Sequence, residues 1–396
     1  MSQEGAGSIP GSLSFWHAHF GYNGVNMGTW LDAVKERPDS DKTYYIDLVQ
    51  QLRHSGKEPE LLGQEPVWSR EGRPASLSGW GPVAHHSGHA ARYSALRTGK
   101  LDWNGGVLWD DAAAIIKTNP ELKYVRYLPD TTFVMYMRTD KADLPFSKLK
   151  VRQALAMAVD QNTLKNVFYG GNAEILAWPI IDCKEYHNAY VPLDQLPADV
   201  QELYSYNPTK AKQLLTEAGY PTGFTTKILC YNSSVYIDLL SQIQAMWAKI
   251  GVNLQLDAVD YAVWRAKSGT RAYDEMEYWS TSGIGTYYKM INFSGAGNFN
   301  GSYVNDPTVE AARLKMLDYV GVEGGEAKMD ALHRELMPYL LKQCYVITRP
   351  SPYTYAFWQP WVKGYQGEHY TGYYNVFATY KYTWLDVNLR KQMIGK

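Results

Sequence analysis

The sequence predicts a mixed α/β protein, because helical and strand-like segments alternate through most of its 396 residues. Lys148–Val159 has apolar side chains at helical spacing, whereas Phe224–Tyr231 is short and apolar, as a buried strand is. Asn207 and Pro208 are suited to begin a helix that Gly219 would end. These signals together favour an α/β architecture.

The remaining elements follow from the same signals along the chain. Asp160 is suited to cap a helix that stops at Gly170-Gly171, because its carboxylate can accept from free backbone N–H groups. Pro129-Asp130 is a turn signal between two apolar runs, which predicts two strands. In chain order we expect a helix at 92–99, strands within 124–137, helices at 148–159, 161–169 and 208–219, a strand at 224–231, a helix at 235–250, a strand at 252–256, and helices at 306–319 and 326–341.

Composition excludes several classes of protein. Lys and Arg number 39 and Asp and Glu 40, so the net charge of −1 argues against nucleic-acid binding driven by bulk charge. No apolar run approaches the 18 residues of a membrane span, and the first residues show no signal-peptide pattern. Cys183, Cys230 and Cys344 are far apart, which favours neither a zinc knuckle nor a disulfide framework. We expect no cofactor.

Residues 35–89 differ from the rest of the chain. They are rich in Gly, Pro, Ser, His and charge, and they show little sustained periodicity of either kind. The histidines of HHSGH (85–89) and HAH (17–19) have a spacing that suits metal ligands. A solvated loop, or an accident of a shifted reading frame, explains them as well, and no metal site is expected.

Four stretches carry a family resemblance when taken in order. They are ARYSALRTGKLDW (91–103), PFSKLKVRQALAMAVDQNTLKNVFYGGNAEILAWP (145–179), YNPTKAKQLLTEAGYPTGF (206–224) and LLSQIQAMWAKIGVNLQLDAVDYAVW (239–264). Together they resemble the family 5 extracellular solute-binding proteins, the peptide and nickel receptors of ABC importers. The motifs themselves are structural, since they begin and end helices.

The resemblance implies a class II periplasmic-binding-protein-like fold, in which two lobes close around a solute like a hinge. Residues 131–341 would form the second lobe, and 91–130 with 342–396 would form the remainder of the first. Family members are longer, so the first lobe would be incomplete, truncated at the N-terminus. Segment 1–90 would be atypical and poorly ordered, and we hypothesise that 35–89 is translated out of frame between two compensating shifts.

The candidate ligand residues are aromatic or carry a small polar group, as a cleft that binds by apolar contact and a few polar groups requires. In the family the stretch corresponding to 278–288 lines the cleft. The candidates are Tyr278, Trp279, Ser280, Thr281, Tyr287, Tyr288, Trp178 and Asn298. The alternative for each is ordinary packing. Arg138 either pairs with a ligand carboxylate or forms a surface ion pair.

The charge of this stretch bears on the solute. Peptide receptors of the family commonly carry an aspartate that pairs with the ligand's α-amino group, but no Asp or Glu lies between Tyr278 and Asn305. A neutral site rich in aromatic rings would suit an oligosaccharide or another uncharged solute. Peptide and oligosaccharide-like solutes both stay open.

The sequence favours a binding protein over an enzyme. It has no GxSxG, HExxH or GxxxxGK[ST] motif. The resemblance implies a monomeric receptor, periplasmic or at the cell envelope, whose partners are a small solute and an ABC permease in the membrane. Two alternatives remain: a carbohydrate-active enzyme with an aromatic cleft, and a non-functional truncated remnant of the receptor.

Overall fold

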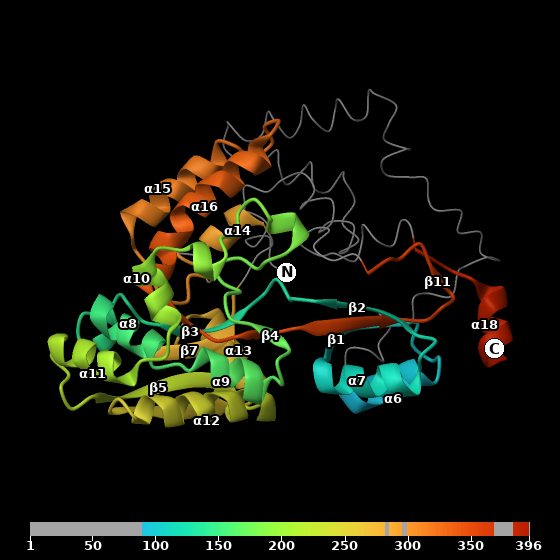
Figure 1. Ribbon diagram of the computed structural model, residues 1–396, viewed down its shortest axis with the longest axis horizontal. Helices are drawn as coiled ribbons and strands as arrows, with labels where there is room; N and C mark the ends of the chain where they lie inside the picture. Colours follow the sequence, from blue (N-terminus) through green and yellow to red (C-terminus); the bar gives the residue numbers. More distant parts are fainter. Residues whose placement is uncertain (1–88, 282–284, 295–298, 368–382, 396) are drawn as a thin grey trace. The chain divides into compact units, whose positions relative to one another are not determined.

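The computed structural model describes residues 89–281, 285–294, 299–367 and 383–395 of the chain (Figure 1). Helices and strands are mixed along these residues, which confirms the predicted α/β class. The hypothesis of a shifted frame at 35–89 concerns residues that, apart from His89, lie outside the described ones. No helix in the described ranges is both long and apolar enough to span a membrane.

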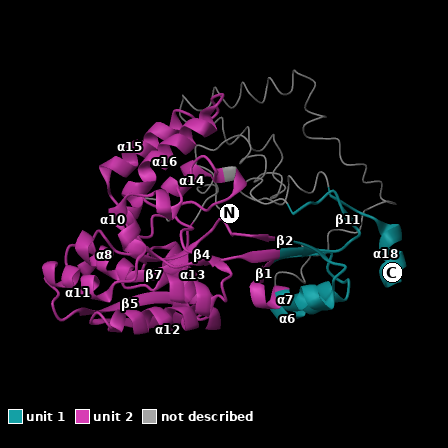
Figure 2. Cartoon of the chain, viewed as in Figure 1, with its two compact units in different colours: residues 1–105, 113–125, 356–396 teal, residues 106–112, 126–355 magenta. Residues whose placement is uncertain are grey.

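The chain divides into two compact units, which Figure 2 colours separately. The first unit contains residues 1–105, 113–125 and 356–396, and the second contains 106–112 and 126–355. The assignment of residues 131–341 to one lobe of a receptor, and of its flanking segments to the other, stays a prediction.

The second unit is built on a five-stranded sheet with the strand order β6-β5-β7-β3-β8. β5 (Phe224–Tyr231) pairs in parallel with β6 (Val252–Val259) and with β7 (Met276–Ser280). β3 (Phe133–Met137) is antiparallel both to β7 and to β8 (Val346–Thr348). Four strands therefore run in one direction, and β3 runs in the other.

One face of this sheet carries the main core of the unit. α8 (Leu149–Met157) and α12 (Ser234–Ala248) supply buried side chains to it, and α11 (Pro208–Glu217) adds Ala211 and Leu215. The alternation of strand side chains sends every second residue of β3 and β5 into the same core. α9 (Gln161–Thr163) and the π-helical turn η4 (Leu164–Phe168) follow α8.

The opposite face of the sheet is covered by α13 (Tyr261–Gly269), through a smaller core. Trp264 of α13 is fully buried and packs with Leu229 of β5 and with Tyr273.

A group of helices adjoins the sheet in the second unit, and Figure 1 shows it in orange and yellow. It comprises α14 (Thr286–Met290), α15 (Pro307–Leu317) and α16 (Gly325–Gln343). Asp306 caps α15 by accepting from the backbone of Thr308 at 2.8 Å. The short elements of the unit are η3 (Pro145–Ser147), β4 (Ala173–Glu174), η5 (Lys184–Tyr186), η6 (Leu193–Gln195), α10 (Ala198–Gln201), η7 (Glu202–Tyr204) and β9 (Ser351–Pro352).

The first unit has its own aromatic core. Trp358, Trp361 and Tyr365 are buried together, and the indole N–H of Trp361 donates to Asp102 at 2.8 Å. The elements of this unit are α6 (His89–Arg97), β11 (Val362–Lys363), β12 (Trp384–Leu385) and α18 (Val387–Ile394).

Three strands contain residues of both units. β1 (Trp103–Leu108), β10 (Thr354–Trp358) and β2 (Lys123–Tyr127) form a sheet in that order, and the chain changes unit within each of them. A fourth change falls within α7 (Trp109–Thr118). The two units are thus joined by several passages of the chain.

Candidate functional site

The carboxyl ends of four strands meet at one edge of the five-stranded sheet. These ends are Tyr231 of β5, Val259 of β6, Ser280 of β7 and Thr348 of β8, while the antiparallel β3 begins at this edge with Phe133. Ligands of open α/β sheets bind outside the carboxyl ends of the strands. We therefore take this edge, which lies within the second unit, as the candidate binding site.

Aromatic rings gather around Phe133 at this edge. Its ring centroid lies 5.0 Å from that of Tyr236, 5.6 Å from Tyr278 and 5.5 Å from Trp279. Phe133, Tyr236 and Trp279 are half-buried, so their rings are partly open to solvent, whereas Tyr278 is buried. The rings offer apolar contact to a solute, and sequence reasoning found two of them, Tyr278 and Trp279.

Tyr278 and Trp279 lie on opposite faces of the sheet, because successive strand residues alternate. Tyr278 belongs to the main core and Trp279 packs on Trp264, with ring centroids 3.8 Å apart. Their common neighbour is Phe133, which contacts both rings at the end of the strand.

Ser280 and Thr281 differ in accessibility although they are adjacent. Ser280 ends β7 and is half-buried, whereas Thr281 is buried. The backbone N–H of Thr281 donates to the carbonyl of Thr132 at 2.7 Å, and its hydroxyl accepts from the N–H of Thr132 at 3.2 Å. Thr281 thus holds the segment that leads into β3.

The other predicted residues have contacts with different partners. Tyr287 and Tyr288 are half-buried on α14, where the hydroxyl of Tyr287 accepts from Arg313 at 3.4 Å. Trp178 is buried, and its ring packs edge-on against Phe293 at 5.1 Å. Asn298 lies outside the described residues. The role of all eight predicted residues in ligand binding stays a prediction.

Sequence reasoning missed Arg349, which directly follows β8 at this edge. Arg349 is 5% exposed; its Nε donates to the hydroxyl of Tyr278 at 3.2 Å, and its Nη1 donates to the carbonyl of Pro350 at 2.5 Å. The guanidinium carbon lies 5.8 Å from the ring centroids of both Phe133 and Tyr169. The one sequence signal was a cation placed immediately after the apolar run CYVIT.

A buried ion pair lies next to this edge in the chain. Lys289 of α14 and Asp130 are 2% and 4% exposed, and their Nζ and Oδ1 atoms lie 3.2 Å apart. Asp130 also accepts from the hydroxyl of Tyr186 at 3.3 Å. Burial raises the pKa of Asp130 and lowers that of Lys289, against their mutual attraction. The pair ties α14 to the segment before β3.

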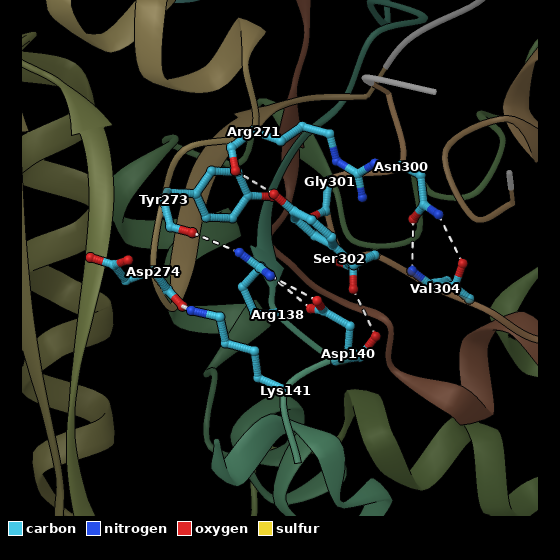
Figure 3. Close-up of polar contacts among 12 residues, drawn as sticks. Arg138, Asp140, Lys141, Arg271, Tyr273, Asp274, Asn300, Gly301, Ser302 and Val304 are labelled. Atoms are coloured by element: carbon cyan, nitrogen blue, oxygen red, sulfur yellow. Dashed lines mark hydrogen bonds and ion pairs between the residues drawn. The ribbon is translucent and has the colours of Figure 1, made fainter. Parts of the chain in front are cut away.

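The opposite edge of the sheet carries a different polar cluster, centred on Arg138 (Figure 3). Arg138 holds Asp140 through two hydrogen bonds of 2.7 Å and donates to the carbonyl of Tyr273 at 3.0 Å. Two guanidinium groups also lie over the ring of Tyr303. Their carbon atoms, in Arg138 and Arg271, are 3.7 and 3.6 Å from its centroid. Of the two alternatives for Arg138, the structure shows the ion pair.

The described residues contain no group of three or more His, Cys, Asp or Glu side chains that could hold a metal ion. His89 begins α6, where its Nδ1 lies 3.3 Å from the hydroxyl of Tyr93. The remaining histidines of the two clusters at 17–19 and 85–89 lie outside the described residues.

Comparison with known proteins identifies the family of this chain. The sequence model of the bacterial extracellular solute-binding proteins, family 5, matches residues 85–301. The chain belongs to this family. The glutathione-binding protein GsiB of Pectobacterium atrosepticum is 30% identical over 182 residues, which cover 46% of this chain and 32% of that protein. The chain thus matches about a third of the length of this relative.

Solved structures of periplasmic binding proteins share the fold. The protein AgaA from A. tumefacien R10, in complex with agropinic acid, is 25% identical with a TM-score of 0.60, over 75% of this chain and 58% of that one. The protein DppA from Helicobacter pylori, in complex with the peptide STSA, is 21% identical with a TM-score of 0.59, over 75% and 55%. These are two-lobe binding proteins, so the predicted fold class is confirmed.

Proposed function

We propose that this chain is the solute-binding receptor component of an ABC importer and binds a small solute without changing it chemically. The observation that carries the proposal is the edge of the five-stranded sheet, where half-buried aromatic rings and a buried arginine lie at the carboxyl ends of the strands. Membership of a family of solute-binding proteins supports it.

The proposed solute is of the size of a short peptide or a small organic acid. The three related proteins described above bind, by their names or complexes, glutathione, the peptide STSA and agropinic acid. None of these is an oligosaccharide, so the expectation of an oligosaccharide-like solute finds no support among them.

The proposed partner is an ABC permease, and the proposed location is the periplasm or the outer surface of the cell. The family description, which is of extracellular proteins, supports this location. The passage of the chain between units within β1, β2 and β10 is the kind of connection that a hinge requires, and hinge closure around solute is the signal that a permease would sense. We propose that the receptor acts as a monomer.

The proposal is tested by binding and recovery of the solute. The purified full chain is mixed with a set of short peptides, small organic acids and uncharged sugars, and thermal unfolding shows which compound raises the melting temperature. The bound compound is then released and weighed by mass spectrometry. Recovery of an unaltered compound supports a receptor. Release of a cleaved or modified product contradicts the proposal and favours an enzyme.

A further inference from the structure

We infer that Arg349 is the contact for a carboxylate group of the solute, so that the receptor takes a solute that carries a carboxylate rather than one without any charged group. This inference rests on the proposed function and adds the chemical class of the ligand. It also gives the site a charge that the stretch 278–288, which has no charged side chain, does not supply.

The first step is that Arg349 is a buried cation with no anion among the described residues. The carboxylate oxygens of the described residues form no ion pair or hydrogen bond with its guanidinium, which donates to the phenol of Tyr278 and to the carbonyl of Pro350. Burying a charge is costly unless it is paired. The nearby phenols do not supply the charge, because burial raises the pKa of Tyr169, Tyr236 and Tyr278 and keeps them neutral.

The second step is that Arg349 makes a single hydrogen bond to a distant described segment, from its Nε to the hydroxyl of Tyr278 at 3.2 Å. Its Nη1 bonds the carbonyl of the very next residue, and its Nη2 bonds no described residue. Arg152 is equally buried and also has no carboxylate partner within the described part of the chain, but it joins distant segments. It donates to the carbonyl of Gln343 at 2.9 Å and to that of Phe146 at 2.8 Å. Gln343 ends α16, whose carbonyl end attracts a cation. Arg152 therefore ties backbone carbonyls of two segments together, whereas Arg349 bonds one distant phenol and its own neighbour.

The third step is the position of Arg349 at the edge where ligands of such sheets bind. It follows β8 directly and lies beside Phe133, a half-buried ring at the same edge. A planar guanidinium beside aromatic rings has the geometry to bind a carboxylate through two parallel hydrogen bonds. At the opposite edge Arg138 makes such a pair with the chain's own Asp140. We propose that the solute provides the matching carboxylate for Arg349.

The test compares tri-alanine with its C-terminal amide, together with reduced glutathione, succinate and uncharged maltotriose as probes. Binding to the full chain is measured by calorimetry at constant ionic strength. We expect at least one carboxylate probe to bind, and Arg349→Met to raise its dissociation constant by about 10- to 100-fold. Arg349→Lys keeps the charge but loses the planar guanidinium, so its dissociation constant should lie between those of the wild type and R349M. If tri-alanine binds, its C-terminal amide should bind the wild type more weakly than tri-alanine does. In R349M the two peptides should bind with equal affinity.

Stability of the free protein is the second measurement, with Arg152→Met as the matched control. R152M should lower the melting temperature, because two distant segments lose their donor. R349M should leave it unchanged or raise it, because an unpaired buried charge is removed. An equal loss in both variants would assign Arg349 a structural role and overturn the inference.

The remaining outcomes separate this inference from the proposed function. Binding of maltotriose alone, equally by wild type and R349M, would keep the receptor and overturn the carboxylate contact. Equal weakening of tri-alanine and its amide in R349M would also overturn it. If none of the probes bound, the inferred carboxylate contact at Arg349 would be overturned. Binding of another, uncharged solute would still support a receptor.

Discussion

Lys289 binds Asp130 twice in the interior of the second unit. Its Nζ lies 3.2 Å from the carboxylate Oδ1 and donates a hydrogen bond of 2.6 Å to the backbone carbonyl of the same residue. One side chain on α14 thus fixes both the charge and the backbone of the segment that leads into β3. This segment leads to the edge that carries the candidate site. The ion pair therefore helps to fix the position of Phe133, the first residue of β3.

Replacing Lys289 with Met should therefore destabilise the protein strongly. The substitution leaves the carboxylate of Asp130 buried without its partner, and the loss of one member of a buried pair costs about 3–5 kcal/mol. Urea unfolding of wild type and variant measures the difference. Lys150→Met is the matched control, because Lys150 pairs with Glu217 at 2.8 Å on the surface and should cost at most about 1 kcal/mol. Similar losses of unfolding free energy in the two variants would show that the buried pair of Lys289 and Asp130 stabilises the fold no more than a surface pair does.

Glu277 predicts a dependence of stability on pH. Burial raises the pKa of Glu277 from its ordinary value of 4.5 to about 7. Between these pH values the folded protein holds a proton that the unfolded chain has lost, so this group's contribution to stability falls as the pH rises through the window. The loss is about 3 kcal/mol by pH 7, with no further loss above it.

The variant Glu277→Gln isolates this effect, because it cannot ionise. The unfolding free energy of wild type and variant should be measured by urea denaturation from pH 4 to pH 8. The wild type should lose stability relative to the variant as the pH rises to about 7. A difference between the two proteins that stays constant over this range would count against a protonated Glu277 in the fold.

Local signals in the sequence identified much of the fold of the second unit. The strand predicted at 224–231 is β5 itself, and Asn207 caps α11 as expected, accepting from the N–H of Lys210 at 2.9 Å. Asp160 likewise accepts from the backbone of Thr163 at 2.9 Å. These features depend on neighbouring residues, so the sequence contains all that decides them.

The candidate site depends on residues that are far apart in the sequence. Phe133, Trp279 and Arg349 meet because β3 lies between β7 and β8, and no periodicity reveals that strand order. The aromatic stretch was visible, but its alternation across the sheet separates Tyr278 from Trp279. Sequence reasoning therefore found the rings and missed the cation beside them.

The parallel pair β5 and β6 predicts a sharp difference between two glycines. Gly223 and Gly171 both have φ of +78°, which other residues adopt with strain. A methyl group on Gly223 would lie 1.9 Å from the carbonyl oxygen of Gly251, where the two strands start side by side, whereas one on Gly171 meets nothing within 4 Å. Gly171→Ala should cost about 1–2 kcal/mol, and Gly223→Ala about 1–3 kcal/mol more. Equal losses in chemical denaturation would mean that β5 and β6 begin further apart.

Substitutions of Trp264 and Trp279 should have different effects, one mainly on stability and the other on binding, although the two ring centroids lie 3.8 Å apart. Trp264 is the fully buried residue of α13, so Trp264→Ala leaves a cavity and should cost about 3–5 kcal/mol of unfolding free energy. Trp279 is half-buried at the edge that carries the candidate site, and Trp279→Ala should cost about 1–2 kcal/mol. If the edge binds the solute, Trp279→Ala should weaken binding while the variant stays folded. A variant that binds normally would place the solute away from β7.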